Sequence, residues 1–295
     1  MIANDVLELV GNTPLVRMDF LGKNYATVLA KLEYFNPSGS VKDRTAKYLI
    51  EYAEASGKID KNKEILEASS GNFGVSLAMI AAVKGYKVTI VLPENSSLIK
   101  KRLIEAFGGK IIFSPADKGT AGAIELKKKL LKKYPKKYID INQFENPANI
   151  LAHYYTTGKE LIEQTHGKID MIIVGIGTGG TGMGVSMAVK SFNPSIKVIG
   201  VMPAANMRIE GLRNLKDKDS SRLFKRNFFD EIREIKKGET SQILEVAREV
   251  AKKKGILLGP SGSVVMYVAM EKAKILGKGK NIVAIIADNG VRYMW

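Results

Sequence analysis

The stretch Met171-Ile172-Ile173-Val174-Gly175-Ile176-Gly177-Thr178-Gly179-Gly180-Thr181-Gly182-Met183-Gly184 decides the fold of this chain. Its first four residues form a short apolar run, which predicts a buried parallel strand, and residues 185–189 continue as a helix. The same alternation recurs elsewhere, with predicted strands at 64–68, 87–92, 110–113 and 281–287 and predicted helices at 74–83 and 97–107. Strands separated by helices in this way favour an α/β fold with doubly wound parallel sheets.

The glycine-rich turn between this strand and helix is a predicted phosphate site. Backbone N–H groups in such a turn, together with the positive end of the following helix, attract an anion, and Thr178 and Thr181 add hydroxyl donors. Gly175, Gly177 and Gly180 also fit the GxGxxG spacing of a dinucleotide fold. We disfavour that alternative because the turn lies past the midpoint of the chain and the next strand, 198–202, is followed by no acidic residue. Glycine required only for tight packing is the remaining alternative.

Lys42 is the candidate nucleophile. It lies in Asn36-Pro37-Ser38-Gly39-Ser40-Val41-Lys42-Asp43-Arg44, where Ser40 and Asp43 predict a helix N-cap and capping box. A lysine in the first helical turn lies near unpaired amides and the positive end of the helix dipole, so it is biased toward the free amine that attacks a carbonyl carbon. An exposed lysine in a lysine-rich protein is the alternative. With the phosphate turn, however, a reactive lysine indicates pyridoxal phosphate as the cofactor.

Several further motifs occur in an order that resembles the cysteine synthases, which belong to the β-family of pyridoxal-phosphate enzymes (fold type II). The cysteine synthase B branch is the most similar, and the resemblance covers nearly the whole chain. The motifs are Val10-Gly11-Asn12-Thr13-Pro14-Leu15-Val16, Lys31-Leu32-Glu33, Ser69-Ser70-Gly71-Asn72, Gln143-Phe144-Glu145-Asn146-Pro147, Thr156-Thr157-Gly158 and Gly290-Val291-Arg292-Tyr293-Met294.

This resemblance implies an architecture of two doubly wound parallel-sheet domains with the cofactor in the cleft between them. We expect a smaller N-terminal domain of residues 1–12 and 36–146, and a larger cofactor-binding domain of residues 13–35 and 147–295. The resemblance also implies a homodimer.

The reaction that the resemblance implies is a β-replacement. L-cysteine would form from O-acetylserine, or another activated serine, and sulfide, through an α-aminoacrylate intermediate. The same chemistry run from cysteine is an alternative: a lyase that releases hydrogen sulfide with serine, pyruvate or lanthionine as product. A serine/threonine dehydratase is a further alternative, and a binding module without cofactor is the non-enzymatic one.

The resemblance assigns roles to residues of this chain. Lys42 would bind the cofactor covalently and then act as the base that removes the Cα proton. Ser261 would meet the pyridine nitrogen, with Asn289 as the second candidate, and Asn72 would bind the ring hydroxyl. The expected phosphate contacts are Gly177, Thr178, Gly179, Gly180 and Thr181. The expected carboxylate contacts are Ser69, Ser70, Gly71 and Gln143. For Ser69 to Asn72 and for Ser261, helix capping alone is the alternative.

Three features of the sequence depart from the family pattern and bear on the choice of reaction. Phe73 replaces a hydroxyl residue in the loop that holds the substrate carboxylate, and serine/threonine dehydratases vary there. Gly259-Pro260-Ser261-Gly262-Ser263 departs from the Gly-x-Ser-Ser-Gly pattern. The substrate loop 211–221 is unusually polar: Arg213 would meet an anionic leaving group or sulfur donor, and Asp219 (or Asp217) is a candidate base, with a solvated loop acid as the alternative.

Composition excludes several other functions. The net charge is +16, but the basic runs are almost pure lysine without aromatic or arginine platforms, so a nucleic-acid surface is not expected. The chain has no cysteine and two histidines, His153 and His166, which predicts neither a disulfide nor a metal site. No apolar run is long enough for a membrane helix and the N-terminus lacks a secretory signal. We therefore expect a cytoplasmic, metal-free enzyme. The basic runs are Lys127-Lys128-Lys129, Lys132-Lys133, Lys136-Lys137 and Lys252-Lys253-Lys254, expected on solvated helix faces.

Overall fold

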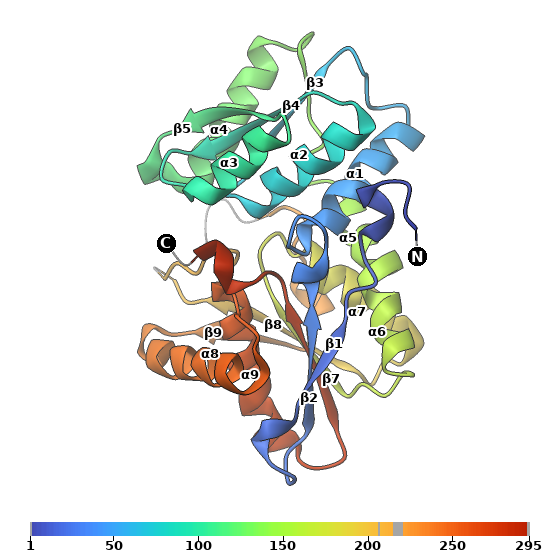
Figure 1. Cartoon of the computed structure of the whole chain (residues 1–295), viewed down its shortest axis with the longest axis vertical. Helices are drawn as coiled ribbons and strands as arrows, with labels where there is room; N and C mark the ends of the chain where they lie inside the picture. Colours follow the sequence, from blue (N-terminus) through green and yellow to red (C-terminus); the bar gives the residue numbers. More distant parts are fainter. Residues whose placement is uncertain (1, 206, 215–220, 294–295) are drawn as a thin grey trace. The chain divides into compact units, whose positions relative to one another are not determined.

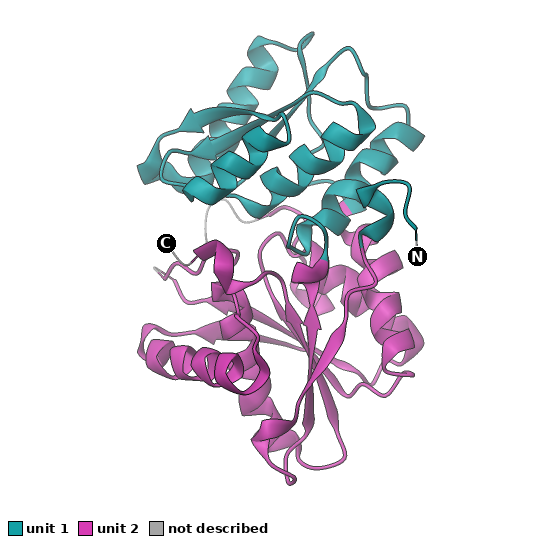
Figure 2. Ribbon diagram, viewed as in Figure 1, with its two compact units in different colours: residues 1–10, 36–148 teal, residues 11–35, 149–295 magenta. Residues whose placement is uncertain are grey.

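The computed structural model describes residues 2–205, 207–214 and 221–293. The chain forms two compact units, each built from two segments of the sequence (Figure 2). Unit 1 comprises Met1–Val10 and Asn36–Ala148, and unit 2 comprises Gly11–Phe35 and Asn149–Trp295. The predicted domain boundaries lie within two residues of these bounds.

Unit 1 is a parallel sheet covered on both faces (Figure 1). The strand order is β5-β4-β3-β6, and neighbouring strands are parallel. Successive residues of the central strand β3 point to opposite faces: Ile65 packs with α1, α2 and α3, whereas Leu66 packs with α4. Because both faces of the sheet are covered, every residue of β3 is buried. The bounds are β3 Glu64–Ala68, β4 Val88–Pro93, β5 Lys110–Ser114, β6 Tyr138–Ile139, α1 Lys42–Ala55, α2 Asn72–Lys84, α3 Leu98–Ala106 and α4 Gly119–Lys133.

Unit 2 contains a larger sheet with the strand order β1-β2-β10-β7-β8-β9. All pairs are parallel except that of the edge strand β1 with β2, so the sheet is parallel, as predicted, apart from one antiparallel edge strand. The short connection from Met18 to Thr27 explains the exception, because a parallel crossover needs a dozen residues or more. The bounds are β1 Leu15–Met18, β2 Thr27–Leu32, β7 Met171–Gly175, β8 Lys197–Pro203, β9 Glu231–Ile235 and β10 Asn281–Ile286.

The two faces of the unit 2 sheet are covered by different helices. In β10, Ile282 and Ala284 pack with α8 and α9, whereas Val283 and Ile285 pack with α6 and α7. The doubly wound prediction is therefore confirmed. The helices are α5 Ala148–His153, a π-helical turn η5 Tyr154–Gly158, α6 Lys159–Gln164, α7 Gly180–Phe192, α8 Thr240–Lys254 and α9 Pro260–Leu276. Short 3-10 helices are Val6–Leu9, Asp19–Leu21, Glu33–Phe35, Ala116–Lys118, Arg226–Phe228, Lys237–Glu239 and Gly290–Tyr293.

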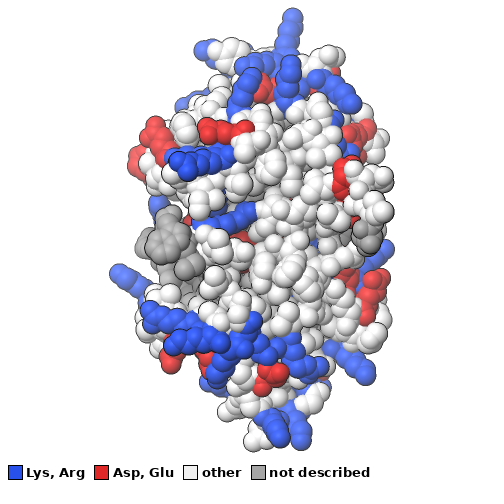
Figure 3. Space-filling view, viewed as in Figure 1, with Lys and Arg blue, Asp and Glu red and all other residues white. Residues whose placement is uncertain are grey.

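Most lysines lie on the surface, where acidic side chains stand among them on the viewed face (Figure 3). Glu125, for example, pairs with Lys129 at 2.6 Å, and Glu249 pairs with Lys253 at 2.6 Å. Lys127 contradicts the prediction that this run is solvated, because its side chain is buried under α4. Among the described residues, no helix has the length and apolar character needed to span a bilayer.

Candidate active site

Lys42 lies in the first turn of α1, as predicted, and is the first residue of that helix; it is partly buried. The predicted capping box is wrong, however. The Asp43 carboxylate does not reach back to Ser40 but accepts hydrogen bonds from the backbone N–H of Ser38, at 2.7 Å, and from the Ser38 hydroxyl. The helix begins at Lys42, so its N-cap is Val41 and not Ser40. Asp43 is therefore the second helical residue, whereas a capping box needs the third. The result is a closed loop that holds the backbone on both sides of Lys42.

A second turn of unit 1 joins β3 to α2. The Ser69 hydroxyl accepts the N–H groups of Gly71 and Gly74, each at 3.0 Å, and thereby shapes the turn. Gly71 has φ +150°, and the buried Lys100 side chain packs directly against it, so any larger residue would be strained. Ser70 is exposed. This turn therefore brings together Ser69, Ser70 and Gly71, with Asn72 opening α2 beside them.

Phe73 is not part of that surface. Its side chain is 2% exposed and packs in the apolar cluster formed by α1 and α2. The family resemblance implies that Phe73 lies in the substrate loop in place of a hydroxyl residue. In the structure it contributes to the core of unit 1.

Gln143 lies against the same turn. Its side-chain amide donates to the carbonyl oxygen of Ala68 at 3.0 Å, and its backbone N–H donates to Glu67 Oε2 at 3.1 Å. Ala68 is the residue directly before Ser69. The structure thus places Gln143 next to the loop that is expected to hold a carboxylate.

The glycine-rich turn of unit 2 lies between β7 and α7, as predicted. Asn149 Nδ2 donates to Thr178 Oγ1 at 3.0 Å, and the N–H of Gly180 donates to the same oxygen at 3.3 Å. A Cβ at Gly180 would overlap the Asn149 amide, and Gly179 has φ +88°, so glycine is required at both positions. The first amides of α7 have no carbonyl within the helix to bind. Backbone N–H groups at a helix start, left accessible by glycines, are suited to bind a phosphate group.

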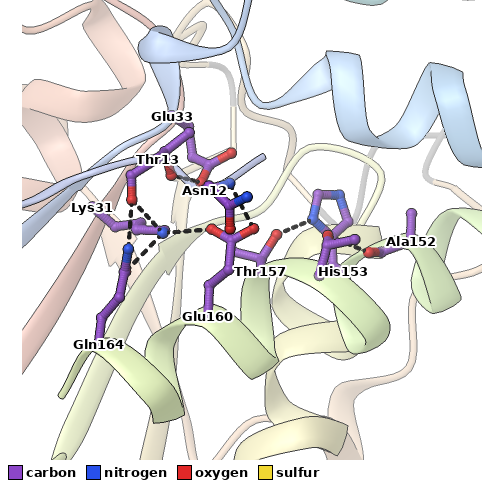
Figure 4. Close-up of polar contacts among 10 residues, drawn as sticks. Asn12, Thr13, Lys31, Glu33, Ala152, His153, Thr157, Glu160 and Gln164 are labelled. Carbon is purple, nitrogen blue, oxygen red and sulfur yellow. Dashed lines mark hydrogen bonds and ion pairs between the residues drawn. The ribbon is translucent and has the colours of Figure 1, made fainter. Parts of the chain in front are cut away.

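Two residues beside this turn were not assigned to the site from the sequence. Asn149 supports Thr178, as described, and His153 connects the turn to the helix before it. His153 is buried, with Nδ1 at 2.9 Å from Thr157 Oγ1 and Nε2 at 3.2 Å from Thr181 Oγ1. Figure 4 shows His153 and Thr157 turned toward each other. Their four-residue spacing on one helix face was the available signal.

Ser261 and Asn289, the two candidates for the pyridine nitrogen, lie at the same end of unit 2. Ser261 is buried in the first turn of α9, and an added Cβ at Gly211 would lie 3.5 Å from its hydroxyl. Asn289 forms an isolated antiparallel bridge with Leu258, just before α9. The hydroxyl of the nearby Ser263 donates instead to the carbonyl of Gly259 at 3.0 Å.

The predicted substrate loop is described only in part. Arg213 lies beside the glycine-rich turn, since its backbone N–H donates to the carbonyl of Ile176 at 2.9 Å. Asp217 and Asp219 fall outside the described residues. The predicted site residues are divided between the units: Lys42, Ser69 to Asn72 and Gln143 belong to unit 1, and the glycine-rich turn, Arg213, Ser261 and Asn289 belong to unit 2.

Comparisons with known proteins agree with this chemistry. Residues 6–288 match the family model described as "Pyridoxal-phosphate dependent enzyme". A cysteine synthase of Aquifex aeolicus (strain VF5) is 41% identical over 297 residues, which cover 98% of this chain and 90% of that protein. The crystal structure of a cysteine synthase from Entamoeba histolytica superposes with a TM-score of 0.89 at 35% identity, covering 100% of this chain and 90% of that one. A hydrogen sulfide-producing enzyme from Fusobacterium nucleatum gives a TM-score of 0.91 at 36% identity, covering 100% and 99%. This chain therefore belongs to the family of pyridoxal-phosphate-dependent enzymes.

Proposed function

We propose that this protein is a cysteine synthase that makes L-cysteine from O-acetylserine and sulfide. The observation that carries the proposal is the 41% identity with a cysteine synthase over 98% of this chain, a span that includes both the Lys42 loop and the glycine-rich turn. Bound pyridoxal phosphate supplies an electron sink that makes the Cα proton of an amino-acid substrate acidic.

Lys42 is assigned two tasks. Its amine binds the cofactor, and once substrate has replaced it there, the same amine takes the Cα proton. Both tasks need a side chain that returns to one place. The bond from Ser38 to Asp43 supports this assignment because it holds the backbone around Lys42.

The turn from Ser69 to Asn72, with Gln143, is assigned to the substrate carboxylate. Amides at the start of α2 and the Ser69 and Ser70 hydroxyls are donors suited to an anion. A Ser69 hydroxyl that accepts two amides still has its own hydrogen to donate. Asn72 is assigned to the cofactor's ring hydroxyl.

The glycine-rich turn of unit 2 is assigned to the cofactor phosphate, with contacts from Gly177 through Thr181. Ser261 is assigned to the pyridine nitrogen, and Asn289 is the alternative at the same end of the unit. A neutral serine partner leaves that nitrogen largely unprotonated, which suits elimination and replacement at Cβ better than transamination. Arg213 is assigned to an anionic leaving group or sulfur donor.

A second function, hydrogen sulfide release from cysteine, is supported by the similarity to the Fusobacterium nucleatum enzyme over the full chain. Both reactions need the same groups around the amino acid and differ in which Cβ substituent leaves. We also infer a cytoplasmic homodimer, which rests on the family resemblance; light scattering of the purified protein tests the dimer.

The test compares two reactions in the same preparation. One assay measures cysteine formed from O-acetylserine and sulfide, and the other measures sulfide released from cysteine alone. The proposal predicts that the first has the larger kcat/KM. A larger kcat/KM for sulfide release would assign the chain to the second function. Lys42→Ala should abolish both, while Lys58→Ala, at an exposed lysine of the same unit, should leave both intact.

A further inference from the structure

A buried cluster of charged side chains lies beneath Gln143 in unit 1. Lys127 of α4 donates to Glu67 Oε1 at 2.8 Å and to Asp140 Oδ1 at 2.9 Å. The side chains of Glu67 and Lys127 are 0% and 2% exposed, whereas that of Asp140, at 27%, reaches solvent. Burying a pair of charges is costly and rarely improves stability over a well-packed apolar pair. This cost suggests a role beyond stability.

The second oxygen of Glu67 shows what that role is. Glu67 Oε2 accepts the backbone N–H of Gln143 at 3.1 Å, while Oε1 accepts the N–H of Ala68 at 2.8 Å as well as the Lys127 ammonium. The Gln143 side chain in turn donates to the carbonyl of Ala68 at 3.0 Å. One carboxylate therefore holds both Gln143 and the last residue of β3, directly before the turn assigned to the substrate carboxylate.

The ammonium of Lys127 favours the charged form of Glu67, the form that accepts these hydrogen bonds. Burial raises the pKa of Glu67, and the adjacent Lys127 ammonium counteracts that rise. Burial lowers the pKa of Lys127, but the two carboxylates outweigh it and raise this pKa, which keeps the ammonium charged. Asp140 also accepts the N–H of Asn142 at 2.9 Å, so the cluster holds the chain on both sides of Ile141.

We propose that Glu67, Lys127 and Asp140 are positioning residues that set the affinity of the site for the α-carboxylate of its amino-acid substrate by fixing Gln143. This inference rests on the proposed function for the identity of the substrate. It adds residues that touch neither substrate nor cofactor and act through Gln143.

The test uses two ligands that differ only in the carboxylate. L-serine and L-serinamide are titrated into the holoenzyme while the visible absorbance of the bound cofactor is followed. Lys127→Met keeps an unbranched side chain one atom shorter than that of lysine and removes its charge. We expect its dissociation constant for L-serine to rise about tenfold and that for L-serinamide to change less than about twofold. In the assay with O-acetylserine and sulfide, KM should rise by a similar factor with kcat nearly unchanged.

Lys129→Met is the matched control, because Lys129 lies on the same helix with a side chain that is 69% exposed. It should bind both ligands as the wild type does. Should Lys127→Met fail to fold, Asp140→Asn makes the same comparison at the partly exposed end of the cluster, with a smaller loss, about threefold, for L-serine alone.

The inference would be overturned if the variant lost affinity equally for both ligands, or lost none for L-serine. The cluster would then be a purely structural feature. Failure of the proposed function looks different. In that case the wild type makes no cysteine from O-acetylserine, yet the contrast between serine and serinamide still reports on Gln143.

Discussion

The carboxylate of Asp43 accepts the backbone N–H of Ser38 at 2.7 Å, and this bond closes the loop that carries Lys42. Asp43 is fully buried, and the Ser38 hydroxyl lies 3.0 Å from that of Ser76 in α2, so the loop is tied to the helix next to it. Asp43, the residue beside Lys42, thus holds the backbone of the loop that carries the proposed cofactor lysine.

Replacing Asp43 with alanine should therefore loosen that loop. We expect the free energy of unfolding to fall by about 2 kcal/mol, because the N–H of Ser38 loses a charged acceptor. The kcat of cysteine formation should fall more than KM rises. Asp43→Asn keeps one acceptor oxygen and should retain more activity. A kcat for Asp43→Ala equal to that of the wild type would show that the loop does not position Lys42.

The glycine-rich turn predicts a defined effect on cofactor affinity. Gly180→Ala places a methyl group against the Asn149 amide, which supports Thr178. The dissociation constant for pyridoxal phosphate, measured by equilibrium titration of the apoenzyme, should rise about tenfold or more. Gly238→Ala, where no atom lies within 4 Å of an added Cβ, is the control and should bind the cofactor normally. Equal affinities in the two variants would remove this turn from the cofactor site.

A second buried cluster of charged and polar side chains is centred on Lys31 in unit 2 (Figure 4). Lys31 donates to Glu160 at 2.7 Å, to Gln164 at 2.9 Å and to the carbonyl of Thr13 at 2.6 Å. Lys31→Met leaves the Glu160 charge poorly compensated and should lower the free energy of unfolding by about 3–5 kcal/mol in urea titrations. Lys280→Met breaks the exposed pair with Asp170 and should have little effect. If both variants lost a similar amount of unfolding free energy, burial would not be what makes the Lys31 cluster important for stability.

Asp230 predicts how stability depends on pH. Burial alone raises the pKa of its carboxyl group, but hydrogen bonds from the Lys190 ammonium and the Val198 N–H outweigh it and lower this pKa. A folded pKa below the unfolded one stabilises the protein above the unfolded value, about pH 4, and this contribution disappears as pH falls through the folded value. Asp230→Asn should therefore reduce the free energy of unfolding by about 1 kcal/mol at neutral pH, with the difference narrowing in acid.

The matched control for this pH series is Glu125→Gln, since the Glu125 side chain is 51% exposed and its partners are surface lysines. Its free energy of unfolding should follow that of the wild type at every pH. If the difference in the free energy of unfolding between Asp230→Asn and the wild type stayed constant across the pH series, the ionisation of Asp230 would make no contribution to stability.

Much of the fold could be predicted because several strands are short, largely apolar runs between helices. The predicted strand at 64–68 coincides with β3, and β7 follows its predicted range. The antiparallel pairing of β1 could not be recognised from apolar patterning, since it depends on the length of the connection to β2. The place of Lys42 in the first turn of α1 was predicted, but the first residue of the helix and the partner of Asp43 were not, because a shift of one residue in the helix start decides both.

Lys127 shows a different limit. In a run of three lysines, charge alone does not show which side chain faces the sheet. Position does: Lys127 lies four residues after the buried Ala123, on the face of α4 that packs on the sheet, whereas Lys128 and Lys129 do not. Its partners, the buried Glu67 and the partly exposed Asp140, lie elsewhere in the sequence and become neighbours through the pairing of β3 with β6.

The most direct test of the central claim asks which lysine holds the cofactor. Holoenzyme is treated with sodium borohydride, which reduces the bond between lysine and cofactor, and digested; mass spectrometry then locates the added phosphopyridoxyl group. We expect modification of the peptide that contains Lys42, and no modification of that region in Lys42→Ala. Modification of a different lysine in the wild-type protein would contradict the assignment of Lys42 and the site built around it.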